Sequence, residues 1–127
     1  MTVKDFSKAY SLWEKTNLGV KSLAVEKKEL TQTIKFNPNI CFVVEEDDRI
    51  IGTLLGDFNG RRGFIHRLAI DPNYQHKGYG SILLSKVQKA LKKAGADTVL
   101  LWVDCANLNV LPLRLDKNPS LLRKALV

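Results

Sequence analysis

The sequence predicts an α/β (α+β) sandwich in which helices flank a mixed, mostly antiparallel sheet. Two observations lead to this fold class. Apolar residues follow a helical period in the first third of the chain and again over residues 81–93, and strand-like runs bounded by turn residues lie between and after these stretches. The length of 127 residues, with 45% hydrophobic and 26% charged side chains, fits one globular domain over residues 1–127.

The first two expected elements are helices. Apolar residues recur at helical spacing over residues 5–16. A second helix is expected over residues 22–36, with Ser22 as its N-cap and Asn37-Pro38 as its stop. The apolar side of this second helix is expected to consist of Leu23, Leu30, Ile34 and Phe36.

Three strands are expected next, at residues 40–44, 49–55 and 64–70. The acidic turn of residues 45–48 joins the first two into an antiparallel hairpin. Asn59-Gly60 marks the turn before the third strand, which stops at Asp71-Pro72.

The last elements are a helix and a strand. The loop of residues 73–80 leads into an amphipathic helix from Ser81 to Lys93, whose lysines face outward. Gly95 is expected just after the end of this helix, because glycine readily adopts the left-handed conformation found there. The apolar run of residues 98–103 is interpreted as a fully buried strand.

The positive charge is concentrated in the second half of the chain. Residues 1–63 carry ten basic and nine acidic side chains, whereas residues 64–127 carry ten basic and four acidic ones. Such a bias is typical of a chain that binds a polyanion, although it also fits a solvated basic face without a partner. No recognised nucleic-acid motif and no apolar run long enough to span a membrane is present, so we expect no nucleic-acid and no membrane partner.

The cysteines indicate a reducing compartment and no metal. The N-terminus lacks the features of a signal peptide, so a cytoplasmic location is expected. Cys41 lies in an apolar run and is interpreted as a buried small hydrophobe. The chain has two cysteines and two histidines, and none of them has the close spacing of metal ligands, so no metal site is predicted. A nucleophilic Cys–His pair is supported only by the presence of both residue types.

The chemistry is expected in the loop Gln75-His76-Lys77-Gly78-Tyr79-Gly80, between a strand and a helix. Two glycines let the backbone turn sharply and approach a ligand closely. The helix start presents free N–H groups and the positive end of its dipole, which together bind phosphate oxygens. The spacing matches neither the dinucleotide fingerprint nor the P-loop, so the residues alone leave a pyrophosphate site and a plain connector as alternatives.

The segment of residues 68–84, LAIDPNYQHKGYGSILL, resembles the acetyl-CoA signature of the GNAT superfamily of N-acetyltransferases. In that signature an apolar-small-apolar triplet ends a strand. Asp-Pro follows. A helix then opens with a six-residue pattern: Gln or Arg, any two residues, Gly, any one residue, and Gly or Ala. The order of the flanking elements also agrees, and the resemblance covers roughly residues 5–111. It implies a three-layer GNAT-like fold, a mostly antiparallel sheet and acetyl-CoA as cosubstrate.

The resemblance also implies the roles of individual residues. Backbone amides of the loop and the helix start would hold the pyrophosphate, strand residues would pair with the pantetheine arm, and an amide at Leu68 or Ala69 would polarise the thioester carbonyl. The residues implied in cofactor binding are Leu68, Ala69, Ile70, Gln75, His76, Lys77, Gly78, Tyr79, Gly80, Ser81 and Asn107. Five lysines between Gln75 and Lys93 would then serve the phosphates of the cofactor.

The implied activity is direct acetyl transfer to a primary amine of a small molecule or peptide, by a monomer or a homodimer. His66 is a candidate general base, because imidazole titrates near neutral pH, and a strand histidine satisfied by a hydrogen bond is the alternative. By strand alternation His66 and Arg67 are expected on opposite faces. Trp13 would line the substrate pocket or belong to the core.

One departure from the family concerns the C-terminal part. The position where relatives carry the tyrosine that donates a proton to the CoA thiolate is occupied by Arg114, and no Gly-Phe strand follows. The C-terminal part is therefore expected to be divergent, truncated or frameshifted. The alternative function is a non-catalytic or degenerate acetyl-CoA-binding module.

Overall fold

The computed structural model describes residues 1–16, 18–101 and 111–114. Its elements, in chain order, are the 3₁₀ turn η1 (Val3–Asp5), helices α1 (Phe6–Lys15) and α2 (Leu23–Phe36), strands β1 (Cys41–Glu46), β2 (Arg49–Phe58) and β3 (Gly63–Ile70), the 3₁₀ turn η2 (Pro72–Tyr74), helix α3 (Tyr79–Ala94), and strands β4 (Thr98–Leu101) and β5 (Leu111–Arg114). The predicted order of helices and strands is confirmed through β4.

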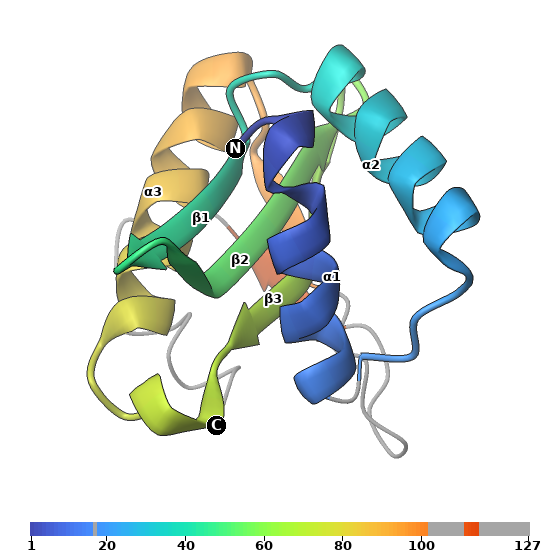
Figure 1. Cartoon of the computed structure of the whole chain (residues 1–127). Helices are drawn as coiled ribbons and strands as arrows, with labels where there is room; N and C mark the ends of the chain where they lie inside the picture. The colour runs from blue at the N-terminus through green and yellow to red at the C-terminus, as the bar shows by residue number, and fades with distance from the viewer. Residues whose placement is uncertain (17, 102–110, 115–127) are drawn as a thin grey trace.

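The strands form a sheet with the order β1-β2-β3-β4-β5 over the described residues. All neighbouring strands are antiparallel except β3 and β4, which are parallel and are connected through α3. Helices α1 and α2 cover one face of the sheet and α3 covers the other (Figure 1). The predicted α+β class, with its mixed and mostly antiparallel sheet between helical layers, is confirmed.

Each face of the sheet carries its own apolar core. Between the sheet and α3, buried side chains such as Leu54, Ile65 and Val87 pack together. On the opposite face, Trp13 and Leu30 from the two N-terminal helices pack against Leu55 and Ala69 of the sheet. Trp13 is only 1% exposed, so it belongs to the core.

Short turns with left-handed residues connect the strands. Asp47 and Asp48 both have positive φ, at 49° and 61°, and form the two-residue turn between β1 and β2. Glu45 and Glu46, expected in this turn, instead pair within the sheet. In the next turn the side chain of Asn59 accepts hydrogen bonds from the backbone N–H groups of the two arginines that follow Gly60.

Two sequence-based details of burial are wrong. Leu23 and Phe36 of α2 are 58% and 77% exposed, whereas Glu26 is buried one turn before Leu30. The helix thus turns a charged residue inward, because that residue has a buried partner on β3. Strand β4 alternates between buried and half-buried side chains, because only one of its faces packs against α3.

Glycine residues cap both ends of helix α3. The helix begins two residues earlier than expected, with Gly78 as N-cap at a φ of 91°. Gly95 ends it at a φ of 112°, and the N–H groups of Gly95 and Ala96 donate to the carbonyl of Leu91, which confirms the expected C-terminal stop. Among the described residues no helix has the length and apolar character required to cross a bilayer.

The close packing of β2 against α3 makes a testable prediction at Gly56. A Cβ atom at this position would lie 2.7 Å from the carbonyl oxygen of Ile40 and 2.8 Å from Cγ2 of Val87. We therefore expect Gly56→Ala to lower the free energy of unfolding by about 1–3 kcal/mol in urea denaturation, because the core must move apart. Gly52→Ala is the matched control, since its nearest neighbour is the flexible end of Ile70. Equal losses in the two variants would contradict this account of the packing.

Candidate functional site

The candidate site begins where β3 continues beyond its ladder with β4. The parallel ladder pairs residues 63–65 of β3 with residues 99–101 of β4. Strand β3 then runs on for five more residues. Three of them, His66, Ala69 and Ile70, pair with β2 on one edge, and none of the five has a strand partner among the described residues on the other. This free edge contains the predicted site residues Leu68, Ala69 and Ile70 and leads directly into the turn before α3 (Figure 1).

A β-bulge interrupts this part of β3 at Arg67. The register with β2 shifts between the pairs Leu55–His66 and Thr53–Ala69, and Arg67 adopts a φ of 54°. The extra residue resets the alternation of side chains. The expectation that His66 and Arg67 point to opposite faces is therefore wrong: His66 contacts Asp57 and Arg67 contacts Glu26, both on the face covered by α1 and α2.

The side chain of Arg67 is held by three groups from the N-terminal helices and their connection. Its guanidinium lies 2.6 Å from Oε1 of Glu26, donates to the carbonyl of Leu18 at 2.8 Å, and stacks over the ring of Trp13 at 5.0 Å. The same Oε1 atom accepts the backbone N–H of Lys21. Arg67 thereby connects β3 to α1, to α2 and to the segment between the two helices.

The turn after β3 is fixed by Asp71. Its carboxylate accepts the N–H of Asn73 and pairs with Lys15 of α1 at 2.9 Å, while its own N–H donates to the carbonyl of Ile51. Pro72 occupies the first position of η2, where it needs no N–H partner. The hydrogen bond from Lys15 and then that from Asn73 hold the pKa of Asp71 below its ordinary value.

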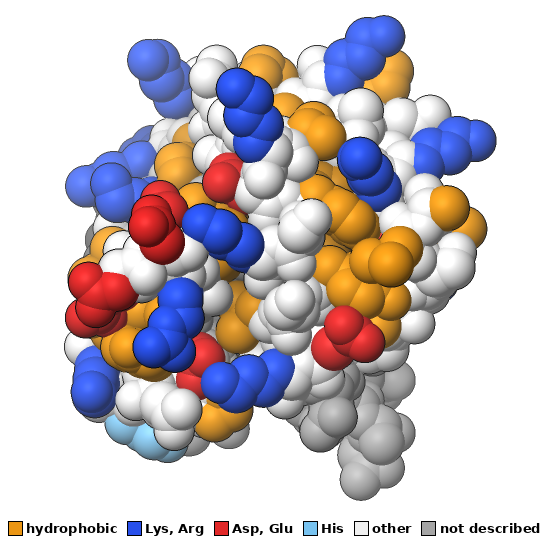
Figure 2. Space-filling view, in the orientation of Figure 1, with side chains coloured by type: hydrophobic (Ala, Val, Ile, Leu, Met, Phe, Trp, Pro, Cys, Tyr) orange, Lys and Arg blue, Asp and Glu red, His pale blue; other side chains and the backbone are white. Residues whose placement is uncertain are grey.

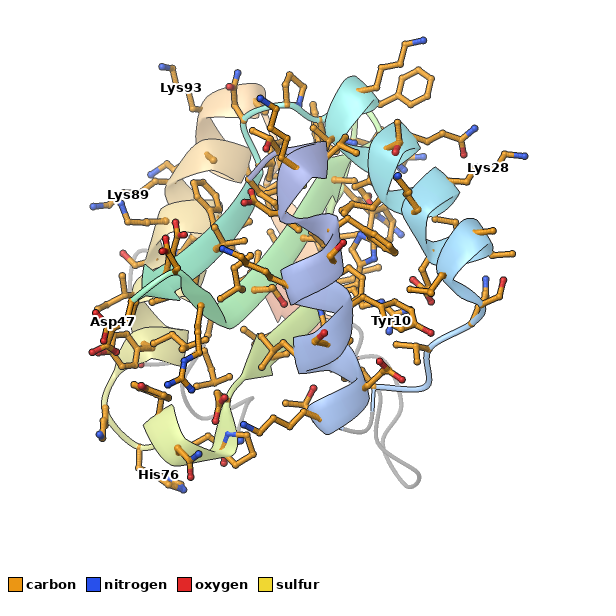
Figure 3. The ribbon with its side chains drawn as sticks, viewed as in Figure 1. Tyr10, Lys28, Asp47, His76, Lys89 and Lys93 are labelled. Atoms are coloured by element: carbon orange, nitrogen blue, oxygen red, sulfur yellow. The ribbon has the colours of Figure 1, made fainter. Side chains whose placement is uncertain are left out.

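The N-terminus of α3 forms the end of this turn. His76 adopts a left-handed φ of 64°, is exposed and points away from the body of the molecule (Figure 3). Nothing lies within 4 Å of a Cβ atom at Gly78, so the space beside this cap is open. The first N–H groups of α3 have no partner within the helix, and they are free to bind an anion there.

Lys77 and two tyrosines surround the same turn. The Lys77 ammonium lies 5.4 Å from the centre of the Tyr74 ring, and Tyr74 contacts Tyr79 edge to face at 6.3 Å. Gln75 donates to the carbonyl of Ile70 on the free edge of β3, at 3.1 Å. Gly80 and Ser81, expected in the loop and at the helix start, both lie in the first turn of α3.

The lysines of α3 do not all lie at this turn. Lys89 and Lys93 project from the end of the helix opposite to His76 (Figure 3). At 1.5 Å per residue, Lys93 lies about 20 Å along the axis from the start of α3, which is farther than charges act through salt solution. Lys92 and Lys93 lie in the last turn, where the helix dipole favours cations. Of the five lysines, Lys77 is the one within the turn before α3, and lysine and arginine side chains are spread widely over the surface (Figure 2).

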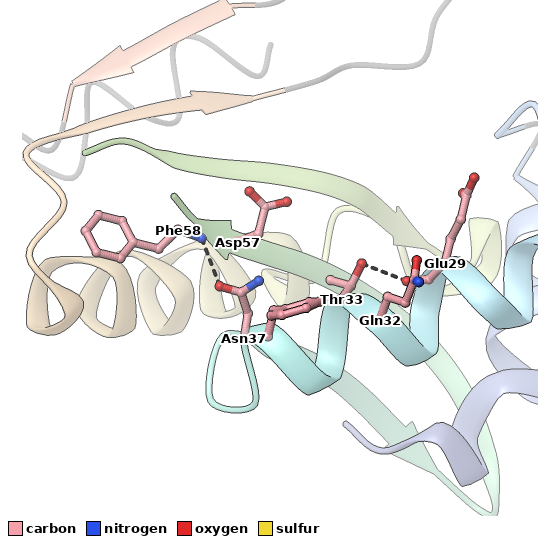
Figure 4. A pocket seen from close by; sticks show the side chains of 7 residues that line it. Glu29, Gln32, Thr33, Asn37, Asp57 and Phe58 are labelled. Carbon is pink, nitrogen blue, oxygen red and sulfur yellow. Dashed lines mark hydrogen bonds between the residues drawn. The ribbon is translucent and has the colours of Figure 1, made fainter. Parts of the chain in front are cut away.

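His66 lies on the other side of the sheet from α3, beside Asp57. Its Nε2 atom is buried and 3.0 Å from Oδ2 of Asp57, and this close contact is not a hydrogen bond of good geometry. Asp57 also lines an open cleft of about 430 Å³ between α2 and the end of β2 (Figure 4). The cleft is lined by Glu29, Gln32, Thr33, Phe36, Asn37, Asp57 and Phe58.

The sequence did not indicate Asp57, Thr53 or Glu26 as parts of a site. The Asn59-Gly60 turn sets the register of the hairpin of β2 and β3, and this register places Asp57 diagonally opposite His66. The turn is therefore the sequence signal from which the proximity of Asp57 and His66 could have been predicted. No local pattern reports the contact between Glu26 and Arg67, which are 41 residues apart. Cys41 is 3% exposed, and burial raises the pKa of its thiol, so it is a protonated core residue. Asn107 and Cys105 lie outside the described residues.

Comparisons with known proteins agree with this arrangement. The sequence model of the acetyltransferase (GNAT) family matches residues 6–113. An acetyltransferase of Sodalis glossinidius is 25% identical over 99 residues, which are 78% of this chain and 69% of the relative. Two crystal structures show the same fold. The ribosomal-protein-S18-alanine N-acetyltransferase of Escherichia coli has a TM-score of 0.68 at 20% identity over 84% of this chain and 66% of its own.

The second structure is the PaiA N-acetyltransferase of Thermoplasma acidophilum in complex with coenzyme A, with a TM-score of 0.65 at 22% identity over 81% of this chain and 76% of its own. The chain spans only part of the length of the solved chains that it resembles, for example 35% of an acetyltransferase of Pyrococcus horikoshii and 76% of the Thermoplasma protein. The free edge of β3, the turn after it and the start of α3 all lie within the matched region. The chain belongs to the acetyltransferase (GNAT) family.

The contact between Lys15 and Asp71 predicts a pH-dependent contribution to stability. Because folding lowers the pKa of Asp71, its charge stabilises the fold above about pH 4, and this contribution is lost as the pH falls through the folded-state pKa. We expect Asp71→Asn to lower the free energy of unfolding by about 0.5–1 kcal/mol at pH 7 and by a smaller amount near pH 3. Urea denaturation at both pH values measures this difference. The control is Asp48→Asn, which removes a carboxylate from an exposed turn. A loss of equal size at both pH values would count against the ion pair.

Proposed function

We propose that this protein is an acetyl-CoA-dependent N-acetyltransferase that transfers the acetyl group directly to a primary amine of a small molecule or peptide. The observation that carries the proposal is the anion-binding turn at the start of α3, next to the free edge of β3, in a chain of this family. The solved relative with coenzyme A supports the choice of cosubstrate.

The residues at the turn fit the phosphates of CoA. The cap at Gly78 leaves open space beside it, and the N–H groups at the start of α3 are without helical partners. Lys77 is exposed at the same place, and no acidic residue occurs between Pro72 and Ala96. Backbone amides from Gln75 to Ser81, including those of His76 and Tyr79, would bind the pyrophosphate, and the edge of β3 would bind the pantetheine arm.

The acceptor is proposed to approach from the side of α1 and α2. The cleft beside α2 supports this side, because its carboxylates Asp57 and Glu29 attract an ammonium group and Phe36 and Phe58 offer apolar contact. Glu29 also pairs with Lys21 at 2.7 Å, so Asp57 supplies more of the free charge. His66, in contact with Asp57, is the proposed general base that takes a proton from the amine.

In this mechanism the chain positions the reactants and moves protons. The thioester supplies an activated acyl group, and the protein directs a backbone N–H of β3, at Leu68 or Ala69, to the carbonyl oxygen where negative charge develops. The amine attacks the carbonyl carbon directly, so no nucleophile from the enzyme is required. As the C–N bond forms, the C–S bond of the thioester breaks, and CoA leaves as a thiolate that takes up a proton. His66 holds the proton that the amine gives up.

A non-catalytic acetyl-CoA-binding module is the second candidate. It is favoured by Arg114, which stands where relatives carry the proton-donating tyrosine and whose backbone pairs with Thr98 as the end of β5. Binding would then proceed as proposed while the departing thiolate would lack its acid. The two candidates share the cofactor site and differ in turnover.

Substitutions at Gly80 test the cofactor site without strain. A Cβ atom there would find its nearest neighbour 4.0 Å away, and the residue lies in the first turn of α3. The positive end of the helix dipole stabilises a carboxylate at this position, but the carboxylate repels phosphate. We expect Gly80→Asp to weaken acetyl-CoA binding at least about tenfold relative to Gly80→Asn, a difference of about 1.4 kcal/mol, while both variants stay folded. Calorimetry with acetyl-CoA and with desulfo-CoA measures this, and absence of binding by the unaltered protein would overturn the proposed function.

Turnover separates the two candidate functions. If the protein is an enzyme, it releases CoA thiol from acetyl-CoA in the presence of some member of a panel of diamines, aminoglycosides and lysine-containing peptides. We expect His66→Gln to lower kcat by about 10²–10⁴-fold with little change in the affinity for acetyl-CoA. Tight binding of acetyl-CoA without turnover on any amine would instead support the binding module.

A further inference from the structure

Contacts in the structure hold the orientation of one peptide group of β3, the peptide that joins Arg67 to Leu68. The carbonyl of Arg67 accepts a hydrogen bond from Oγ1 of Thr53 at 2.8 Å. That hydroxyl in turn accepts the indole N–H of Trp13 at 2.9 Å. Thr53 and Trp13 are 0% and 1% exposed, so water does not compete for these groups.

The direction of this carbonyl decides where the N–H of Leu68 points. A trans peptide is planar, and its C=O and N–H point in opposite directions. No cis peptide occurs in the described part of the chain. Because the Arg67 carbonyl faces Thr53, the N–H of Leu68 faces away from it.

The hydrogen bonds farther along β3 agree with this orientation. The N–H of Asp71 donates to Ile51 of β2, so the carbonyl of Ile70 faces the free edge, where the side chain of Gln75 donates to it. Strand alternation then places the backbone groups of Leu68 and Ile70 on the free edge and those of Ala69 toward β2. Of the two amides implied for the thioester carbonyl, Leu68 is the one that the strand turns to the free edge.

The side chain of Arg67 supports the same peptide group from the other end. A φ of 54° is costly for a residue other than glycine, and it persists where surrounding contacts impose it. Here the buried carboxylate of Glu26, the carbonyl of Leu18 and the ring of Trp13 hold the guanidinium. The side chain of the bulge residue is thus fixed to the layer of α1 and α2, and its carbonyl is fixed to Thr53 of β2, which Trp13 of α1 holds in turn.

We propose that Thr53 is a positioning residue for acyl transfer: its hydroxyl, anchored by Trp13, holds the Arg67–Leu68 peptide so that the N–H of Leu68 is directed at the thioester carbonyl. The inference rests on the proposed function, because it concerns the group that polarises acetyl-CoA. Thr53 itself does not touch the reacting atoms.

The test is the infrared spectrum of bound acetyl-CoA labelled with carbon-13 at the thioester carbonyl. A hydrogen bond to this carbonyl lowers its stretching frequency, and the unaltered protein is expected to show the lowered band. Thr53→Val keeps the shape of the side chain but removes the hydroxyl. We expect it to bind acetyl-CoA within about threefold of the unaltered affinity, a change of about 0.65 kcal/mol or less, and to lose the lowered band. Thr53→Ser keeps the hydroxyl and is expected to keep the band.

Two further variants control for packing and folding. Thr53→Ala removes the hydroxyl and puts no methyl group in that position. This variant is used if Thr53→Val does not fold. Thr31→Val removes a hydroxyl that bonds the backbone of α2 on the exposed side, and it is expected to leave the band unchanged. Circular dichroism verifies the fold of each variant.

The outcomes separate this inference from the proposed function. If the folded valine or alanine variant keeps the lowered band, or if the serine variant loses it as the valine variant does, Thr53 does not position the amide. The inference is also overturned if the unaltered protein binds acetyl-CoA without a lowered band. If the unaltered protein does not bind acetyl-CoA at all, the proposed function fails and the inference fails with it.

Discussion

The bulge at Arg67 is the constraint on which the candidate site depends. One extra residue in β3 resets the alternation, so that His66 and Arg67 share a face while Leu68 and Ile70 pack toward α3. A left-handed arginine inside a strand is strained, and it is stabilised by a buried carboxylate and by an indole ring. The layer of α1 and α2 therefore does more than cover the sheet: it sets the shape of the strand edge that leads into the turn before α3.

The second part of the site depends on how the turn after β3 is anchored. Asp71 contacts α1 through Lys15 and β2 through Ile51, so the loop starts from a fixed point. From there the chain needs only a few residues to reach the cap at Gly78, where the backbone takes a conformation that favours glycine. The strand edge and the start of α3 are thus brought next to each other by contacts of this turn to α1 and β2.

The charge of the chain acts more locally than its total suggests. The lysines of α3 lie from the middle of the helix to its end, and those in its last turn interact favourably with the helix dipole and are too far from the turn before α3 to act on it. On the opposite side of the sheet, Asp57 and Glu29 give the cleft beside α2 a local negative character within a chain of net charge +7. An anionic cosubstrate and a cationic acceptor would accordingly find complementary charge on different faces, which fits a direct transfer between them.

The sequence by itself determined the order of elements, the turn at Asn59-Gly60 and the position of the loop before α3, because helical periodicity, glycine and the Asp-Pro pair act over a few residues. It did not determine which residues of α2 are buried, the bulge in β3 or the partners of Arg67 and His66. Glu26 looks like a surface residue in the sequence, since only the tertiary structure places Arg67, 41 residues later, against it. Local patterns do not encode such long-range pairing, and strand alternation fails wherever a bulge adds a residue. The sequence thus located the turn between β3 and α3, and only the fold decided how the strand beside it is oriented.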